Sequence, residues 1–133
     1  MSISAYKRSI RSSETPRDIE RQIFSRITSA LHAHAAHYDE NDDRYTRLQI
    51  LAGPLQMALA ENSRLWGALK SDLGRPGNAL GAELRAQLIS LALYVERETR
   101  AILIGDGSVS ALVTVNRSII DGLAGISPNS TAA

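Results

Sequence analysis

Three histidines lie close together in the first half of the chain. His32, His34 and His37 precede Asp39 and Glu40, and all five are residue types that bind divalent metals. On a helix, His34 and His37 fall on or near the apolar face, whereas His32 points to the opposite side. An i, i+3 pair supplies two ligands, and tetrahedral zinc requires three or four. We therefore expect no metal, a half-buried His34 with a partner, and two surface histidines.

Two asparagines occupy positions where apolar residues would be expected. Asn62 falls at the centre of one helical apolar face and Asn116 at the centre of another. A buried amide without a partner costs about 1–3 kcal/mol, so both should be hydrogen-bonded, most simply to each other or to nearby backbone. In that case they fix the register of the helices. The alternative is that they line a groove and contact the backbone of a partner.

Other chemistry is weakly indicated. Gly105-Asp106-Gly107-Ser108 could hold a phosphate, but without a preceding strand or a GK[ST] ending it favours a helix–helix turn with a serine cap. The chain has no cysteine, which removes thiol nucleophiles, disulfides and iron–sulfur clusters. It has no G-x-S-x-G, and no carboxylate pair stands out by its spacing. We expect no enzyme activity, no catalytic residue and no cofactor; a small enzyme or metal sensor built on His34 and His37 is the alternative.

Length and composition are those of one ordinary globular domain. The chain has 133 residues, of which 44% are hydrophobic and 22% charged. Fifteen Lys and Arg against fourteen Asp and Glu give a net charge of +1, which argues against a general phosphate-backbone binder. The N-terminus has no apolar signal segment, and the longest nearly apolar run, 88–95, is too short to span a bilayer. These features predict a cytoplasmic protein without a membrane segment.

The elements that must position these residues are helices. Apolar residues recur with helical period in four segments, at about 16–37, 42–71, 79–104 and 109–125. Thr15, Asn78 and Ser108 are the expected N-caps of the first, third and fourth helices. The sequence therefore predicts an all-α fold, a small helical bundle of about four helices. Residues 15–125 form the single domain, after a frayed basic lead-in at 1–14 and before a disordered tail at 126–133.

Two helices carry more specific expectations. Gly53-Pro54 lies inside the second segment, yet its apolar face, from Tyr45 and Leu48 onward, keeps the same phase on both sides. This predicts one long helix kinked at Pro54. The third segment has a broad apolar arc, which predicts a central helix packed on two sides.

One aromatic residue and one apolar strip mark the second segment. Trp66, the only tryptophan, lies on its main apolar face and is expected in the core. Ile50, Met57 and Ala68 form a minor strip on the far side, which would be a docking surface for a partner helix if exposed.

Four motifs in order resemble those of one family. TPRDIE (15–20), NSRLW (62–66), ELRAQLISLALYVERET (83–99) and VNRSIIDGLAG (115–125) look like the FlaF family of flagellar biosynthesis regulators, over about residues 5–125. The chain departs from the family pattern in its histidine-rich stretch and at Gly53-Pro54. The resemblance implies a small, all-helical cytoplasmic protein that binds flagellin as an export chaperone and supports flagellin synthesis and filament assembly. It also implies a link to the translational regulator FlbT.

The resemblance nominates five partner-binding residues, Asn62, Arg64, Trp66, Asn116 and Arg117. Periodicity places the two asparagines and the tryptophan on apolar faces, where packing is the alternative role. The two arginines point off those faces and suit a partner or an exposed ion pair.

A second function remains open, a nucleic-acid-binding post-transcriptional regulator of flagellin messenger RNA. It requires a basic face, and the most basic stretch, residues 1–26, carries six positive and three negative charges. Direct nucleic-acid binding is therefore the less favoured hypothesis.

Overall fold

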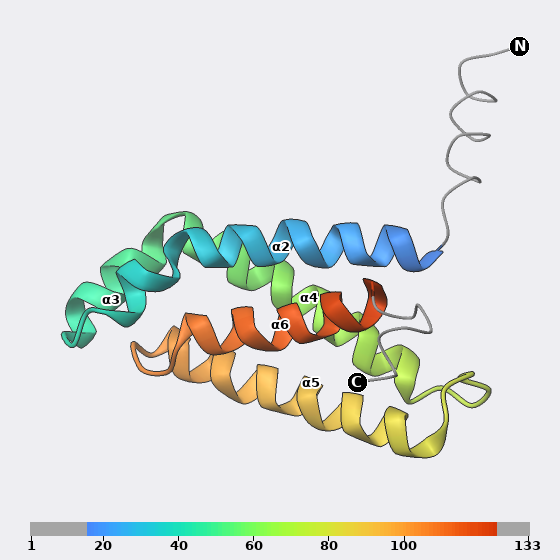
Figure 1. Ribbon diagram of the computed structural model, residues 1–133. Coiled ribbons are helices and arrows are strands. Elements are labelled where there is room, and N and C mark those ends of the chain that lie inside the picture. The colour runs from blue at the N-terminus through green and yellow to red at the C-terminus, as the bar shows by residue number, and fades with distance from the viewer. Residues whose placement is uncertain (1–15, 125–133) are drawn as a thin grey trace, which may run out of the picture.

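The computed structural model describes residues 16–124 as a bundle of antiparallel helices (Figure 1). The described part contains no strand, which confirms the predicted all-α class. The lead-in at 1–14, the Thr15 cap and the tail at 126–133 lie outside the described residues. The elements, in chain order, are α2 (Pro16–Asp39), α3 (Arg44–Ile50), the π-helix η1 (Leu51–Leu55), α4 (Gln56–Leu73), α5 (Ala82–Leu103) and α6 (Val109–Ala124).

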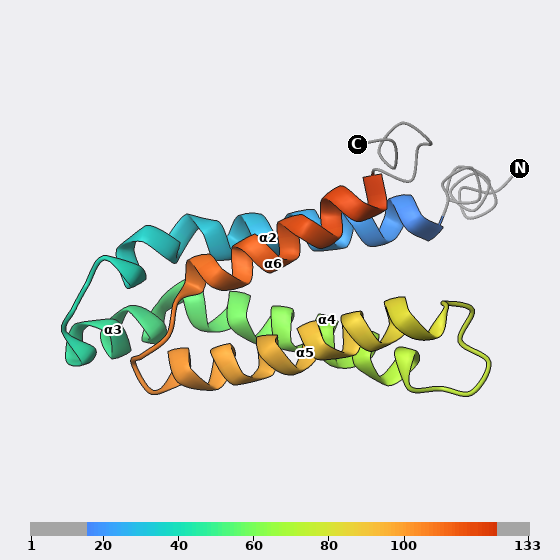
Figure 2. The same cartoon turned by 60° about the horizontal axis from the view of Figure 1, so that its bottom comes forward.

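The bundle has two layers of paired helices. α2 packs mainly against α6, and α4 packs mainly against α5, as the turned view shows (Figure 2). The chain alternates in direction from one long helix to the next, the up-down arrangement of four-helix bundles. Side chains of all four helices meet between the layers in one core, whose large members are Phe24, Leu31, Tyr38, Leu55, Leu59, Trp66, Val95, Ile102, Val109 and Leu112.

The second predicted helix is interrupted by a π-helical turn. Within η1, Gly53 has φ −97° and ψ −151°, which lie outside the helical region. The reason is Pro54, which has no N–H to donate and disfavours helical backbone in the residue before it. Leu51 and Leu55 are nevertheless both buried, so the apolar phase continues across the interruption. A kink at Pro54 itself stays a prediction.

In the first part of the second predicted helix, the residues of the predicted apolar face are not buried. Tyr45 is 70% exposed and Leu48 is also exposed, and across Arg44–Ile50 α3 has no buried residue. Polar contacts hold α3 instead: Arg47 donates to the carbonyl oxygens of Tyr38 (3.1 Å), Asp39 (3.2 Å) and Gly105 (3.2 Å).

Two expectations for the third helix are wrong. α5 begins at Ala82, and its N-cap is Gly81 without a side-chain hydrogen bond. Asn78 instead accepts a hydrogen bond from the backbone N–H of Leu80 (3.0 Å) and so closes a turn within the linker. α5 does pack against two neighbours, α4 and α6, but it is not central, because Leu93 (45%) and Leu103 (49%) remain exposed along it.

The end of the bundle near α3 is closed by Tyr38. Its buried hydroxyl donates to the carbonyl oxygens of Ile102 (2.8 Å) and Asp106 (2.6 Å), and the guanidinium of Arg47 lies 4.8 Å from the centre of its ring. Burial raises the pKa of Tyr38 above its usual 10.0, with Arg47 opposing that shift. The phenol therefore stays a donor throughout the neutral range and ties α2 to the α5–α6 turn.

Replacing Tyr38 with Phe should remove this tie. We expect a loss of about 1–1.5 kcal/mol in the free energy of unfolding, because one hydroxyl proton is shared between two acceptors. The measurement is urea unfolding followed by circular dichroism. The raised pKa adds a check: above pH 10 the unfolded phenol ionises before the folded one, so wild-type stability falls and the gap to Tyr38→Phe narrows. A gap unchanged from pH 7 to pH 11 would contradict this.

The N-terminus of α6 is capped from within and from outside. Ser108 Oγ accepts a hydrogen bond from the backbone N–H of Ala111 (3.2 Å), as predicted for an N-cap. In addition, the carboxylate of Asp39 accepts from the backbone N–H groups of Val109 (2.8 Å) and Ser110 (2.9 Å), and from Ser108 Oγ (3.1 Å). The last residue of α2 thus fixes the first turn of α6.

Candidate functional site

The histidines adopt the exposures expected of them. His34 is half-buried, while His32 and His37 are exposed on α2. Within residues 16–124, no three metal-ligating side chains gather at one place. A partner for His34 stays a prediction.

The two asparagines form a buried hydrogen-bonded group with the tryptophan. Asn116 Nδ2 donates to Asn62 Oδ1 (2.8 Å), and Trp66 Nε1 donates to Asn116 Oδ1 (2.8 Å). All three side chains are fully buried, and the ring of Phe24 meets Trp66 edge-on with centroids 5.9 Å apart. The predicted bond between the asparagines is therefore confirmed. We call these three residues the amide node; it joins α4 to α6 across the layers and lies out of reach of a partner.

Asn62→Leu tests the structural role of the amide node. Leucine leaves Asn116 Nδ2 without its acceptor in the core, which should cost about 1–2 kcal/mol. The cost is limited because Asn62 Nδ2 already lacks a hydrogen-bond partner among the described residues. Thermal and urea unfolding measure it, with the exposed neighbour Ser63 replaced by Ala as a control that should change nothing. Equal stability of Asn62→Leu and the wild type would show that the hydrogen bond between the two asparagines does not stabilise the fold.

The two nominated arginines line pockets on either side of α2. Arg64 borders a pocket of about 300 Å³ between α2 and α4. Its apolar wall is Ile23, Ile27 and Leu65, and an ion pair between Arg26 and Glu61 (2.9 Å) links the two helices at its rim. This pocket combines apolar surface with charges of both signs.

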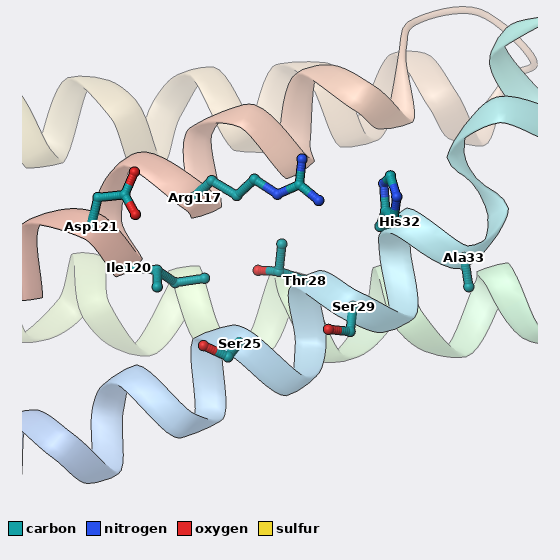
Figure 3. A pocket seen from close by; sticks show the side chains of 8 residues that line it. All are labelled: Ser25, Thr28, Ser29, His32, Ala33, Arg117, Ile120 and Asp121. Carbon is teal, nitrogen blue, oxygen red and sulfur yellow. The ribbon is translucent and has the colours of Figure 1, made fainter. Parts of the chain in front are cut away.

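Arg117 borders the second pocket, of about 490 Å³, between α2 and α6 (Figure 3). Its lining is mostly polar: Ser25, Thr28, Ser29, His32 and Ala33 from α2, with Arg117, Ile120 and Asp121 from α6. Both Arg64 and Arg117 are exposed, and neither forms an ion pair with another described residue. The five nominated residues thus divide into a buried node and two flanking surface cations.

Sequence reasoning missed the α2 walls of both pockets. It singled out Arg64 and Arg117 but not Ile23, Arg26 or Thr28, because nothing in the chain specifies that α2 packs against both α4 and α6. Once that packing is known, the residues on either side of the buried face of α2 can be identified as the walls of the two pockets.

Apolar surface continues beyond the covered core. On α5, Leu84 shares the face of the buried Val95 and Ile102, because it precedes them by 11 and 18 residues, which are close to whole numbers of helical turns. Leu84 is nevertheless exposed, so the inward stripe of α5 runs on past the part that its neighbours cover. Of the predicted minor strip, Met57 and Ala68 are exposed and Ile50 is partly buried.

The bundle carries no candidate for a membrane span between residues 16 and 124, where each helix is too short or too polar. The family model described as "Flagellar protein FlaF" matches residues 2–123, which is nearly the whole chain. No curated protein and no solved structure matches the chain.

Proposed function

The chain belongs to the FlaF family of flagellar proteins, and from this premise we propose that it binds flagellin in the cytoplasm as an export chaperone. In this role it keeps flagellin monomeric and supports flagellin synthesis and filament assembly. The proposal assigns it a binding function and no chemical reaction.

Besides the family membership, the proposal is supported by apolar side chains that lie on the helices but are not buried in the core. Leu84 continues the inward stripe of α5 into solvent, and Ile23 on α2 is also exposed beside the half-buried Leu65 of α4. Exposed apolar residues that continue a core stripe are suited to receive the apolar face of another helix. The terminal segments of flagellin are amphipathic, which is the chemistry such a surface takes.

The pocket between α2 and α4 gives the apolar surface at Ile23 a defined cavity. Its wall of Ile23, Ile27 and Leu65 can receive one apolar side chain of a docked helix, and Arg64 lies at its rim. An apolar centre with a charged rim is the usual composition of a protein–protein interface.

A matched pair of variants tests where flagellin binds. Leu84→Gln places a polar group on the uncovered inward stripe and should weaken flagellin binding about tenfold, measured by isothermal titration calorimetry. Leu93→Gln makes the same change on the opposite side of α5, at nearly the same exposure, and should leave the affinity unchanged. Equal effects of the two variants would argue against binding on the inward stripe.

A further inference from the structure

The pocket between α2 and α6 pairs a cation with hydroxyl groups. We infer that this pocket receives an acidic side chain of the bound polypeptide, with the guanidinium of Arg117 as its anchor. The inference rests on the proposed function. It adds a polar contact with flagellin to the apolar contacts proposed above.

Arg117 is free to bind an external anion. Its side chain is exposed and forms no ion pair or hydrogen bond with any other described residue. Asp121 lies one turn further along α6, at the spacing at which opposite charges often pair. Figure 3 shows instead that the guanidinium points along the pocket toward His32, away from Asp121. The cationic end of the pocket is thus separated from its acidic end.

The wall opposite Arg117 holds an unused hydroxyl. Thr28 is 4% exposed and lines the pocket, yet its Oγ1 has no hydrogen-bond partner among the described residues. A helical threonine commonly bonds a carbonyl one turn back, and a buried hydroxyl without a partner is costly. Ser25 and Ser29 add hydroxyls one turn before and one position after it. A carboxylate accepts hydrogen bonds only, so donors of this kind suit it.

The charges of the pocket favour one carboxylate over a phosphate chain. Among the described residues that line the pocket, Arg117 is the single permanent cation, and Asp121 opposes a second negative charge, whereas a nucleic-acid backbone needs several cations in a row. Guanidinium and carboxylate match each other in a two-bond fork. Because Ser29, Ala33 and Asp121 are exposed, the pocket opens to solvent and admits a side chain presented by a docked chain.

The test is calorimetric titration of the full chain with full-length flagellin at low and at moderate salt. Arg117→Gln should weaken binding about tenfold and reduce its salt dependence, while Arg117→Lys, which keeps the charge but not the fork, should lose less. Arg97→Gln makes the same charge change at an exposed site on α5 and should match the wild type. Asp121→Asn removes a repelling carboxylate and should tighten binding about twofold.

The outcomes separate this inference from the proposed function. If flagellin binds with the same affinity and salt dependence to the wild type and to Arg117→Gln, the acidic-side-chain pocket is wrong and the chaperone role stands. If Arg97→Gln weakens binding as much as Arg117→Gln, the effect is that of overall charge, and the pocket is again wrong. If the wild type itself does not bind flagellin, the proposed function fails and this inference falls with it.

Discussion

Replacing Trp66 with Ala should lower the free energy of unfolding by about 3–5 kcal/mol. Trp66 is a fully buried side chain, and its removal opens a cavity against Phe24 that the surrounding helices can only partly fill. The substitution also leaves Asn116 Oδ1 without its donor. Urea unfolding followed by circular dichroism measures the loss, since the variant has no tryptophan fluorescence.

Trp66→Phe separates the two causes. Phenylalanine keeps most of the ring and its packing on Phe24 but cannot donate to Asn116. We expect it to lose about 1–3 kcal/mol, the cost of an unsatisfied buried acceptor together with the smaller volume. If Trp66→Ala and Trp66→Phe were equally stable, packing in the centre of the bundle would not depend on this ring.

Replacing Asp39 with Ala should have the second-largest effect, about 2–3 kcal/mol. The carboxylate accepts two backbone N–H groups at the start of α6 and the hydroxyl of Ser108. Caps of this kind contribute about 0.5–2 kcal/mol, and bonds to a charged acceptor are stronger than neutral ones. Here the cap also ties the end of α2 to α6, so its loss weakens a tertiary contact as well as a helix end.

Asp42→Ala is the matched control for this change. Asp42 is an exposed acidic residue of the segment that follows α2, and it forms no hydrogen bond or ion pair with another described side chain. It should change stability by less than about 0.5 kcal/mol. Equal losses from Asp39→Ala and Asp42→Ala would mean that the negative charge of the segment matters, and not the cap.

The fold was predictable where local pattern and burial agree. Helical periodicity specified the four long segments, and the apolar faces around Asn62 and Asn116 placed both amides inward. Because a buried amide needs a partner, a bond between the two was one of the simplest expectations, and the structure contains it. The same logic identified Ser108 as a cap, since its partner Ala111 lies three residues away. The helical spacing of apolar residues could not reveal that Tyr45 is exposed. That spacing shows which face of a helix is apolar, but not which turns of the helix pack against a neighbour.

Contacts made over long stretches of chain were not predictable in this way. The cap that Asp39 supplies to α6 joins residues about seventy positions apart, and it depends on how α2 ends beside α6. The pockets at Arg64 and Arg117 likewise need the flanks of α2, which only the packed bundle brings to them. Asn78 has a capping residue type but bonds within the linker, because the helix begins four residues later at Ala82.

The central claim, that this FlaF-family protein binds flagellin, is tested most directly by co-expressing the two full-length chains and separating the product by gel filtration. We predict one soluble peak that contains both chains in a fixed ratio, earlier than either chain alone, with flagellin kept from polymerising. Flagellin that elutes by itself at every ratio of the two proteins would contradict the account.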